Sequence, residues 1–352
     1  MEDFGLSPTL TAPLSPAIPL TIPTPDGSGQ AVHPDVVWFP RGWRGWAYWM
    51  AFSPYRGART KEENPSIVVS QDGMNWQVPA GLVNPVLSPP RETGAYNSDP
   101  DLSYDAANDR LVLLNREMRG KFNVVSALFS TDGVRWSPPR ELFRRPNHGM
   151  ISPAMVWVAA GKPLVWYVDA GTGKCKKRTT QVMRQEAVGA DPLSSAEPAI
   201  GWAPPRPAGL AQPGQVIWHL DVTWIEARRE FWAVYPAYPV GDCGANDLFI
   251  ARSGDGLKWT TYTVPLLRHE ALDWTRQTLY RASLIYDPPR DVVRVFFSAA
   301  AAGDRWRLGY AEFSRLQLFA ALERAPLSSW ISRTFPDGGA PPPDIGEGDS
   351  FP

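Results

Sequence analysis

One short motif occurs three times in this chain and constrains its fold more than any other feature. Its common form is Ser-x-Asp-Gly-x-x-Trp, and its copies lie at 70–76, 130–136 and 253–259. Each copy follows an apolar run that is typical of a strand. An Asp-Gly pair after such a run predicts a tight turn, because Gly adopts a positive φ at little steric cost. The motif therefore predicts three copies of one β-hairpin unit, each with a Trp that packs where the next strand begins.

The spacing of the motif indicates how the units are repeated. From Ser70 to Ser130 is 60 residues, and from Ser130 to Ser253 is 123, about twice as far. A degenerate copy is therefore expected near 190–200, where Trp202 alone is retained. Repeats of this length with several strands each are typical of the blades of a β-propeller or a related array.

A second periodic series gives the number of blades. Strand-like runs recur at 35–39, 101–104, 154–157, 221–225 and 282–286. Each is followed by a polar turn and a second apolar run, and these second runs lie at 48–50, 111–114, 164–167, 231–234 and 292–297. Two strands joined by a polar turn are the signature of a hairpin. The sequence predicts an all-β fold, a five-bladed β-propeller.

Composition supports this fold. Pro (37) and Gly (29) are too frequent among 352 residues for a long helical protein, because both interrupt helix interiors. Most of the 16 Trp fall in the turn motif or in the predicted strands, which favours a packing role between blades over ligand binding.

Charge and hydropathy exclude two classes of partner. The net charge of −1 argues against binding to a nucleic-acid backbone, which needs a basic face. No apolar run approaches the roughly 18 residues of a membrane span. The first residues lack the basic and apolar regions of a secretory signal, so the expected location is cytoplasmic or virion-associated.

Two flanks fall outside the predicted blades. We expect a Pro-rich extended arm at 1–32, the propeller at 33–315, and a C-terminal segment with a Pro/Gly-rich tail at 316–352, with a short helix within 315–333. The arm is expected to pair with the last blade and close the ring. Arm and tail also suit docking to protein partners in a larger particle. Cys175 and Cys243 are either free thiols or one disulfide.

The entries of the five first strands carry the candidate functional residues. In a propeller the first strands line the central channel, so the side chains at their entries converge on one small volume. These residues are His33, Asp35, Asp99, Asp101, Ser152, Trp218, His219, Asp221, Tyr280 and Arg281. Each alone could serve a turn or a cap, but their convergence favours a binding or catalytic site.

The same entries carry a resemblance to known families. The chain resembles the five-bladed propeller glycosidases of the arabinanase, β-xylosidase and invertase type over about residues 33–315, and also a bacterial and phage group. The Asp-Gly turns are similar to sialidase Asp-boxes. The motifs that carry the resemblance are His33-Pro34-Asp35-Val36, Ser98-Asp99-Pro100-Asp101, Trp218-His219-Leu220-Asp221 and Tyr280-Arg281.

The resemblance implies catalytic roles for three aspartates. Asp35 matches the general base, and Asp99 or Asp101 matches the carboxylate that orients the acid. Glycoside hydrolysis needs two carboxyl groups of opposed protonation. The family places its acid, a Glu, at the third-blade entry, where this chain has Ser152 and no carboxylate. Other acids that could reach the same face are Glu63, Glu117, Asp169, Glu270 and Asp273.

The remaining entry residues are expected to bind substrate. They are His33, Ser152, Trp218, His219, Asp221, Tyr280 and Arg281. A mixed set of His33, Asp35, His219 and Asp221 offers possible metal ligands. Their spacing does not single out a metal site, so neither a metal nor another cofactor is expected.

These observations predict a carbohydrate-recognising, glycosidase-like propeller with a glycan or polysaccharide as its partner. Hydrolysis would run through Asp35 with Asp99 or Asp101, with an atypical acid. The alternative is a non-catalytic propeller, either receptor-binding or structural, in a phage tail, virion or surface assembly.

Overall fold

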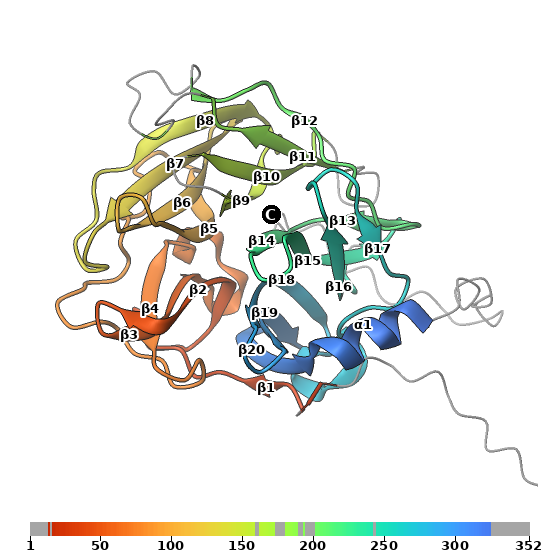
Figure 1. The fold of residues 1–352 in the computed structure, drawn as a ribbon. Helices are drawn as coiled ribbons and strands as arrows, with labels where there is room; N and C mark the ends of the chain where they lie inside the picture. The colour runs from red at the N-terminus through yellow and green to blue at the C-terminus, as the bar shows by residue number, and fades with distance from the viewer. Residues whose placement is uncertain are drawn as a thin grey trace, which may run out of the picture.

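Five antiparallel sheets surround a central axis in the computed structural model (Figure 1). The sheets contain three to five strands each, and most strands pair with the next one in the chain; β13 and β14 both pair with β15, and β1 pairs with β20. This arrangement confirms the predicted five-bladed β-propeller. The structure describes residues 13–324 except 15, 159–161, 173–179, 189–192, 194–200 and 242–243.

The blades follow one another in chain order. The first contains β2 (Ala31–Trp43), β3 (Trp46–Pro54) and β4 (Ser66–Ser70). The second contains β5 (Tyr96–Asp105), β6 (Arg110–Arg119), β7 (Phe122–Ser130) and β8 (Arg140–Pro146). The third contains β9 (Ile151–Trp157), β10 (Pro163–Asp169), β11 (Gln181–Glu186) and β12 (Arg206–Pro207).

The fourth blade contains β13 (Gln215–Ile217), β14 (Asp221–Ile225), β15 (Glu230–Pro239), β16 (Asp247–Ser253) and β17 (Thr260–Thr261). The fifth contains β18 (Thr278–Asp287), β19 (Val292–Ala301), β20 (Arg305–Ser314) and β1 (Ile18–Pro19). Helix α1 (Arg315–Arg324) follows the last blade. Among the described residues, 3₁₀ turns lie at η1 (Arg56–Ala58), η2 (Thr60–Glu62), η5 (His269–Ala271) and η6 (Asp273–Thr275).

The N-terminal arm closes the ring. Strand β1 pairs with β20, with Ile18 opposite Tyr310, and so supplies the outer strand of the fifth blade. The backbone N–H of Leu14 also donates to the carbonyl of Glu312 at 2.7 Å. The two ends of the propeller are thereby joined in one sheet, as the sequence predicted for the arm. The exact division into arm, propeller and C-terminal segment stays a prediction.

The three Asp-Gly motifs form the same turn, and their polar residues act locally. In the second copy, Asp132 accepts hydrogen bonds from the backbone N–H groups of Val134 and Arg135 at 2.9 and 2.8 Å. The Ser130 hydroxyl accepts from the N–H of Gly133 at 2.7 Å. The other copies repeat these contacts. The repeated motif is therefore a structural turn.

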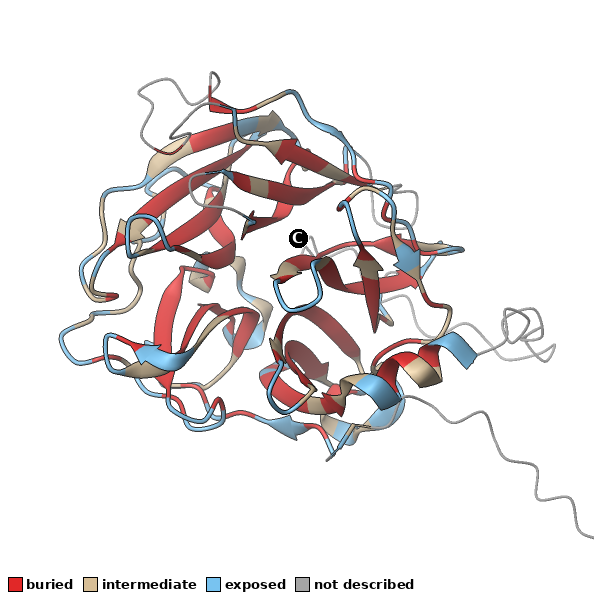
Figure 2. Cartoon of the chain, viewed as in Figure 1, coloured by how far each residue is buried: buried red, intermediate tan, exposed pale blue. Residues whose placement is uncertain are grey.

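The glycine of each turn lies against an aromatic ring of the preceding blade. A Cβ at Gly133 would lie 2.1 Å from the ring of Trp49, and one at Gly256 would lie 2.6 Å from Trp166. Gly73 is less crowded, because a Cβ there would lie 3.3 Å from Tyr48 of its own blade and 3.4 Å from Phe296 of the fifth blade. All three copies need Gly for its positive φ, and the copies at 133 and 256 also need it for the close approach of a buried ring. Buried residues predominate in the strands of every blade, and exposed residues lie mainly in the loops (Figure 2).

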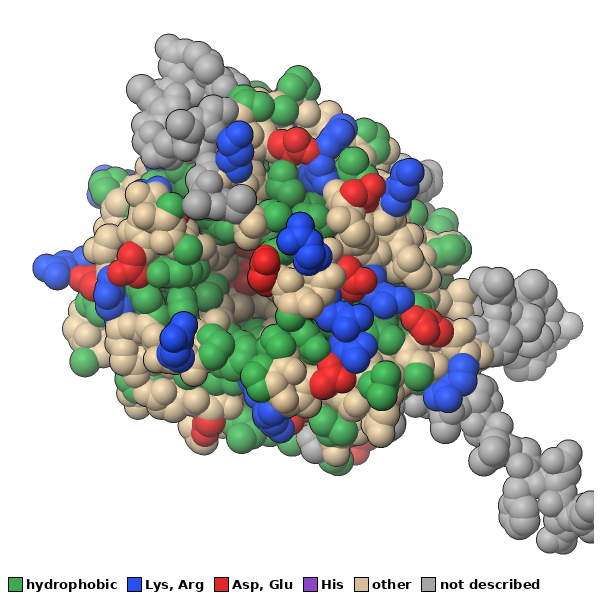
Figure 3. Space-filling model, viewed as in Figure 1, with side chains coloured by type: hydrophobic (Ala, Val, Ile, Leu, Met, Phe, Trp, Pro, Cys, Tyr) green, Lys and Arg blue, Asp and Glu red, His purple; other side chains and the backbone are tan. Residues whose placement is uncertain are grey.

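Some expectations fall on residues that the structure leaves undescribed. Cys175 and Cys243 lie outside the described residues, as does most of the expected degenerate turn. Trp202 is described, and its buried ring packs edge-on against Phe143. Among the described residues, no helix has the length and apolar character needed to cross a bilayer. On the face seen in Figure 3, the described Lys and Arg side chains are interspersed with Asp and Glu.

We predict that two glycine substitutions separate the backbone strain of the turn from its contact with the neighbouring blade. Gly45 and Gly133 have φ of +88° and +76°, but a Cβ at Gly45 meets nothing within 4 Å. Gly45→Ala should lower the free energy of unfolding by about 1 kcal/mol, from strain alone. Gly133→Ala should lower it by about 1–3 kcal/mol more, because the Trp49 ring must move. Denaturant unfolding measures both, and equal losses would contradict the packing role.

Candidate active site

The inner strands enter the channel through β-bulges. The strand register shifts near the start of β2, β5 and β18 and at the matching point of β9. His33, Asp99 and Ser152 lie at these shifts with φ of 55°, 47° and 49°. Such conformations are uncommon for residues other than Gly and cost roughly 1–3 kcal/mol each. The bulges turn these three side chains out of the regular alternation of their strands.

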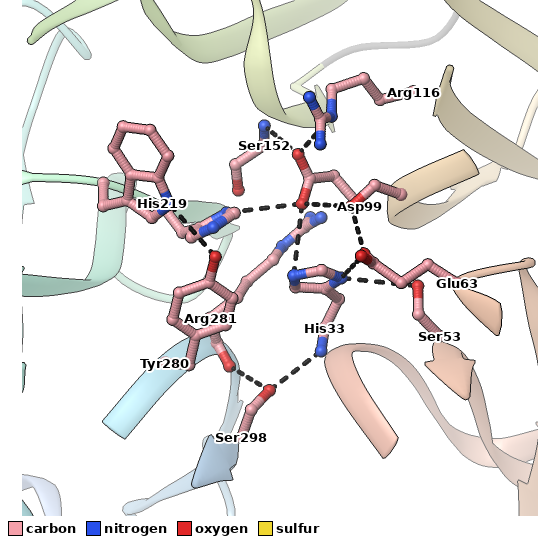
Figure 4. A network of polar contacts seen from close by, with 12 residues as sticks. His33, Ser53, Glu63, Asp99, Arg116, Ser152, His219, Tyr280, Arg281 and Ser298 are labelled. Atoms are coloured by element: carbon pink, nitrogen blue, oxygen red, sulfur yellow. Dashed lines mark hydrogen bonds and ion pairs between the residues drawn. The ribbon is translucent and has the colours of Figure 1, made fainter. Parts of the chain in front are cut away.

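Two imidazoles and one carboxylate meet at the bulges (Figure 4). Oδ1 of Asp99 lies 3.4 Å from Nε2 of His33 and 3.5 Å from Nδ1 of His219. The two rings are 5.2 Å apart, and all three side chains are buried. The three residues come from the first blade, the second blade and the segment before β14, so only the closed ring brings them together.

The other oxygen of Asp99 is held by two donors. Arg116 forms an ion pair with Oδ2 at 2.8 Å, and the backbone N–H of Ser152 donates to it at 3.0 Å. Arg116 is itself positioned by Asn123 at 3.0 Å. Burial by itself would raise the pKa of Asp99, but Arg116, acting together with the neighbouring His219, His33 and Arg281, holds that pKa well below the usual range. Asp99 is therefore a buried carboxylate anion.

Both imidazoles are neutral at physiological pH. Burial lowers the pKa of His33 to about 3 and lowers that of His219 well below its usual value. Nε2 of His33 and both ring nitrogens of His219 have no hydrogen-bond partner among the described residues. A neutral imidazole has one nitrogen lone pair, so these rings can act as ligands.

Glu63 adds a second carboxyl group to this cluster. It follows η2, and its backbone N–H donates to the carbonyl of Thr60 at 3.1 Å. The Ser98 hydroxyl donates to Oε2 at 2.5 Å, and Nδ1 of His33 lies 3.5 Å from the same oxygen. Oε1 has no partner within the described part of the chain. Burial raises the pKa of Glu63 to about 8.

Three further aspartates form a separate cluster, each two residues further along the chain than a member of the first cluster. Carboxylate oxygens of Asp35, Asp101 and Asp221 lie within 4.8 Å of one another. Nη2 of Arg281 contacts Asp35 at 3.0 Å and Asp101 at 3.4 Å. Burial, followed by repulsion from Asp221 and Asp101, raises the pKa of Asp35. Burial likewise raises the pKa of Asp101 to about 7. This cluster borders a cavity of about 280 Å³ that aromatic rings also line, Trp38 and Trp157 among them.

The remaining candidates lie beside the first cluster. The Ser152 hydroxyl donates to the carbonyl of Leu220 at 2.8 Å, so it holds the backbone next to His219. The Trp218 indole donates to the hydroxyl of Tyr280 at 3.1 Å, and the Tyr280 ring is 4.3 Å from that of His219. The structure thus divides the predicted residues into two groups, and their catalytic and binding roles stay predictions.

The alternative acids lie apart from one another. Glu63 belongs to the cluster of Asp99, whereas Glu117 is paired with Arg119 at 2.6 Å. Glu270 and Asp273 have side chains that are 68% and 92% exposed. Sequence reasoning missed Arg116, because an arginine on a second strand carries no motif. Only the register, with Ser98 opposite Arg116, places it beside the bulge.

The donor atoms of the two clusters suit different ligands. Two neutral imidazoles and a carboxylate are the donor set of several catalytic zinc sites, in which a further position stays open. His33, Asp99 and His219 fit that set. The observation that supports it is that Nε2 of His33 and both ring nitrogens of His219 form no hydrogen bond within the described residues. The mixed set considered from the sequence is not the one that assembles, because Asp35 and Asp221 belong to the separate cluster.

Comparison with known proteins gives one relative and many structures of similar fold. No protein-family model matches the chain. The chain is 25% identical, over 83% of its length, to an A type blood N-acetyl-α-D-galactosamine deacetylase of Flavonifractor plautii. It spans about half the length of that relative, 46%.

Solved structures extend the comparison. The chain superimposes on an N-acetylgalactosamine deacetylase from F. plautii, in complex with blood group B trisaccharide, with a TM-score of 0.74 and 26% identity. The match covers 90% of this chain and 98% of that one. The catalytic domain of a Coprinopsis cinerea GH62 α-L-arabinofuranosidase matches with a TM-score of 0.54 and 13% identity, over 88% and 95% of the two chains, and shows the shared fold. The chain is thus similar to carbohydrate-active propeller enzymes.

We predict that Arg116 stabilises the fold by neutralising Asp99. Arg116→Met leaves a buried carboxylate without its cation and should lower the free energy of unfolding by about 3–5 kcal/mol. Arg276→Met is the matched control, because it breaks an exposed pair with Asp273 and should change stability little. Denaturant unfolding at pH 7 measures both. Similar small losses for the two variants would contradict the assigned role of Arg116.

Proposed function

We propose that this propeller is a glycan-acting hydrolase that removes the acetyl group from an N-acetylated amino sugar. The observation that carries the proposal is the convergence of His33, Asp99 and His219 on one point, with Glu63 beside them. The similarity to an N-acetylgalactosamine deacetylase at 26% identity supports the same chemistry.

His33, Asp99 and His219 would hold a divalent metal ion in this site. Such an ion, when bound, polarises a carbonyl oxygen and makes water a better nucleophile. The protein supplies the ligands in the right protonation state, because burial keeps the imidazoles neutral and Arg116 keeps Asp99 ionised. Arg116 and Ser152 occupy the second oxygen of Asp99, which leaves Oδ1 for the ligand role.

Glu63 is the residue placed to transfer protons. Its Oε2 is fixed by Ser98, while Oε1 has no partner among the described residues. In amide hydrolysis a water oxygen bonds to the acetyl carbon as the C–N bond breaks. In its ionised form, which a pKa of about 8 makes the minor form at pH 7, Glu63 would take a proton from that water and return it to the departing nitrogen. The products are acetate and the free amino sugar.

The glycosidase mechanism through Asp35 is the second candidate function. Asp35 and Asp101 lie with Asp221 within 4.8 Å, and both contact Arg281. In the glycosidases that the chain resembles, the acid comes from the third-blade entry, where this chain has Ser152 and no carboxylate. The donor set of His33, Asp99 and His219 therefore favours deacetylation. Release of sugar from arabinan or xylan by the wild type, and loss of that release in Asp35→Asn, would instead favour the glycosidase function.

The non-catalytic alternative, a receptor-binding or structural propeller of a phage tail or virion, stays a prediction. Such a propeller would bind a glycan but would not cleave any bond in it. The strained bulges and the unpartnered imidazole nitrogens favour a catalytic site over it, because structural residues rarely leave buried polar atoms unsatisfied.

We predict that Glu63→Gln abolishes acetate release. Glutamine keeps the size of the side chain but cannot accept the proton, so kcat should fall at least 100-fold on an N-acetylgalactosamine glycoside. Glu270→Gln is the control, since Glu270 is exposed and should leave the rate unchanged. Acetate is measured by an enzyme-coupled assay. Undiminished release by Glu63→Gln would contradict the role, and no release by the wild type on any N-acetylated sugar would contradict the function.

Metal binding offers a second prediction that does not depend on turnover. The wild-type protein should bind one equivalent of Zn²⁺ in equilibrium dialysis, and His219→Ala should lose that equivalent or weaken its affinity at least 10-fold. His269→Ala is the control, because His269 pairs with Asp247 at 2.7 Å on an outer loop. Equal stoichiometry and affinity in the three proteins would place the ion elsewhere.

A further inference from the structure

A polar cavity of about 480 Å³ lies between the second blade and the segment that joins it to the first blade. Its lining includes Asn97, Asn115, Glu117, Arg119, Ser126 and Glu141. We propose that this cavity is a subsite for a neutral sugar unit, adjoining the unit whose acetyl group is removed. The proposal rests on the function proposed above.

The sheet face that forms the cavity changes character along its strands. On β6, Leu111 and Leu113 face the first blade and pack in one apolar cluster with Trp49. Side chains of alternate residues share one face of a strand, so Asn115 and Glu117 continue the same face. Packing between blades needs apolar residues, as at Leu111 and Leu113. The change to polar residues at Asn115 and Glu117 therefore indicates a ligand site.

One buried atom in this cavity lacks a partner. Asn115 is 1% exposed, and its amide nitrogen donates to the Oδ1 of Asn97 at 2.9 Å. The Oδ1 of Asn115 has no partner among the described residues. An unsatisfied buried carbonyl costs about 1–3 kcal/mol. A hydroxyl group of a ligand in the cavity would donate to it.

The charges around the cavity favour an uncharged ligand rich in hydroxyl groups. Glu117 and Arg119 form a two-bond ion pair at 2.9 and 2.6 Å, which offers acceptors and donors side by side. The lining also contains Arg91, Glu92 and Glu141, and Glu141 forms an ion pair with Arg144 at 2.6 Å. Vicinal hydroxyl groups of a sugar donate and accept at once, and so match such a pair. A cavity of this size lies within the range of small-molecule sites.

Hydrogen bonds connect the cavity directly to the candidate active site. The Asn97 amide donates to Oδ1 of Asn64 at 2.9 Å, and the neighbouring Ser98 donates to Glu63. Two adjacent residues of β5 therefore bind two adjacent residues of the loop before β4. A residue of the cavity wall, Asn97, is therefore next in the chain to the residue that binds Glu63, and the proposal assigns the cavity to the next unit of the same glycan.

The test compares a short and a long substrate. The probes are the methyl α-glycoside of N-acetylgalactosamine and blood group A trisaccharide. Glu117→Gln should raise KM for the trisaccharide about 10-fold and leave that for the monosaccharide unchanged. Asp273→Asn breaks an exposed ion pair and is the matched control. If Glu117→Gln is poorly folded by circular dichroism, Ser126→Ala replaces it. Equal effects on the two probes would overturn the subsite.

Equilibrium binding separates this proposal from the proposed function. If the wild type releases no acetate, the deacetylase function fails, and titration calorimetry with the same two sugars then tests the cavity. Tighter binding of the trisaccharide that is lost in Glu117→Gln supports the subsite. Equal affinity of the wild type for both sugars, or no binding of either, overturns it.

Discussion

The buried carboxylate of Asp99 is the constraint on which the rest of the site depends. An ionised carboxylate out of water is costly unless charges and hydrogen bonds surround it. Here Arg116 and the N–H of Ser152 satisfy one oxygen, and the other faces two imidazoles. Because Arg116 balances the charge, His33 and His219 can stay neutral beside the anion. A ligand set for a cation follows from this arrangement.

The same carboxylate explains why the propeller must be closed. Asp99 lies on the second blade, and its contacts come from the first blade, the third blade and the segment before β14. Pairing of β1 with β20 fixes the first and fifth blades to each other. The Asp-Gly turns pack against aromatic rings of the preceding blade, such as Trp49 and Trp166, and so hold neighbouring blades together. Site geometry therefore depends on packing far from the channel.

Local patterns predicted the blades but not the pairing of charges. Hairpins and the Ser-x-Asp-Gly turns depend on short-range conformational preferences, so they can be predicted from one sequence. The entry residues were also predicted to converge. The sequence could not show that bulges separate His33 and Asp99 from Asp35 and Asp101, two residues further on. Nor could it show that Arg116 lies opposite Ser98, because register is a property of the folded sheet.

In the proposed function Asp99 organises a cation site, and the cluster of Asp35, Asp101 and Asp221 does not. Crystals of the protein soaked with Zn²⁺, measured at the zinc absorption edge, test this most directly. The account predicts one anomalous peak between Oδ1 of Asp99 and the ring nitrogens of His33 and His219. A peak among Asp35, Asp101 and Asp221, with none at Asp99, would contradict it.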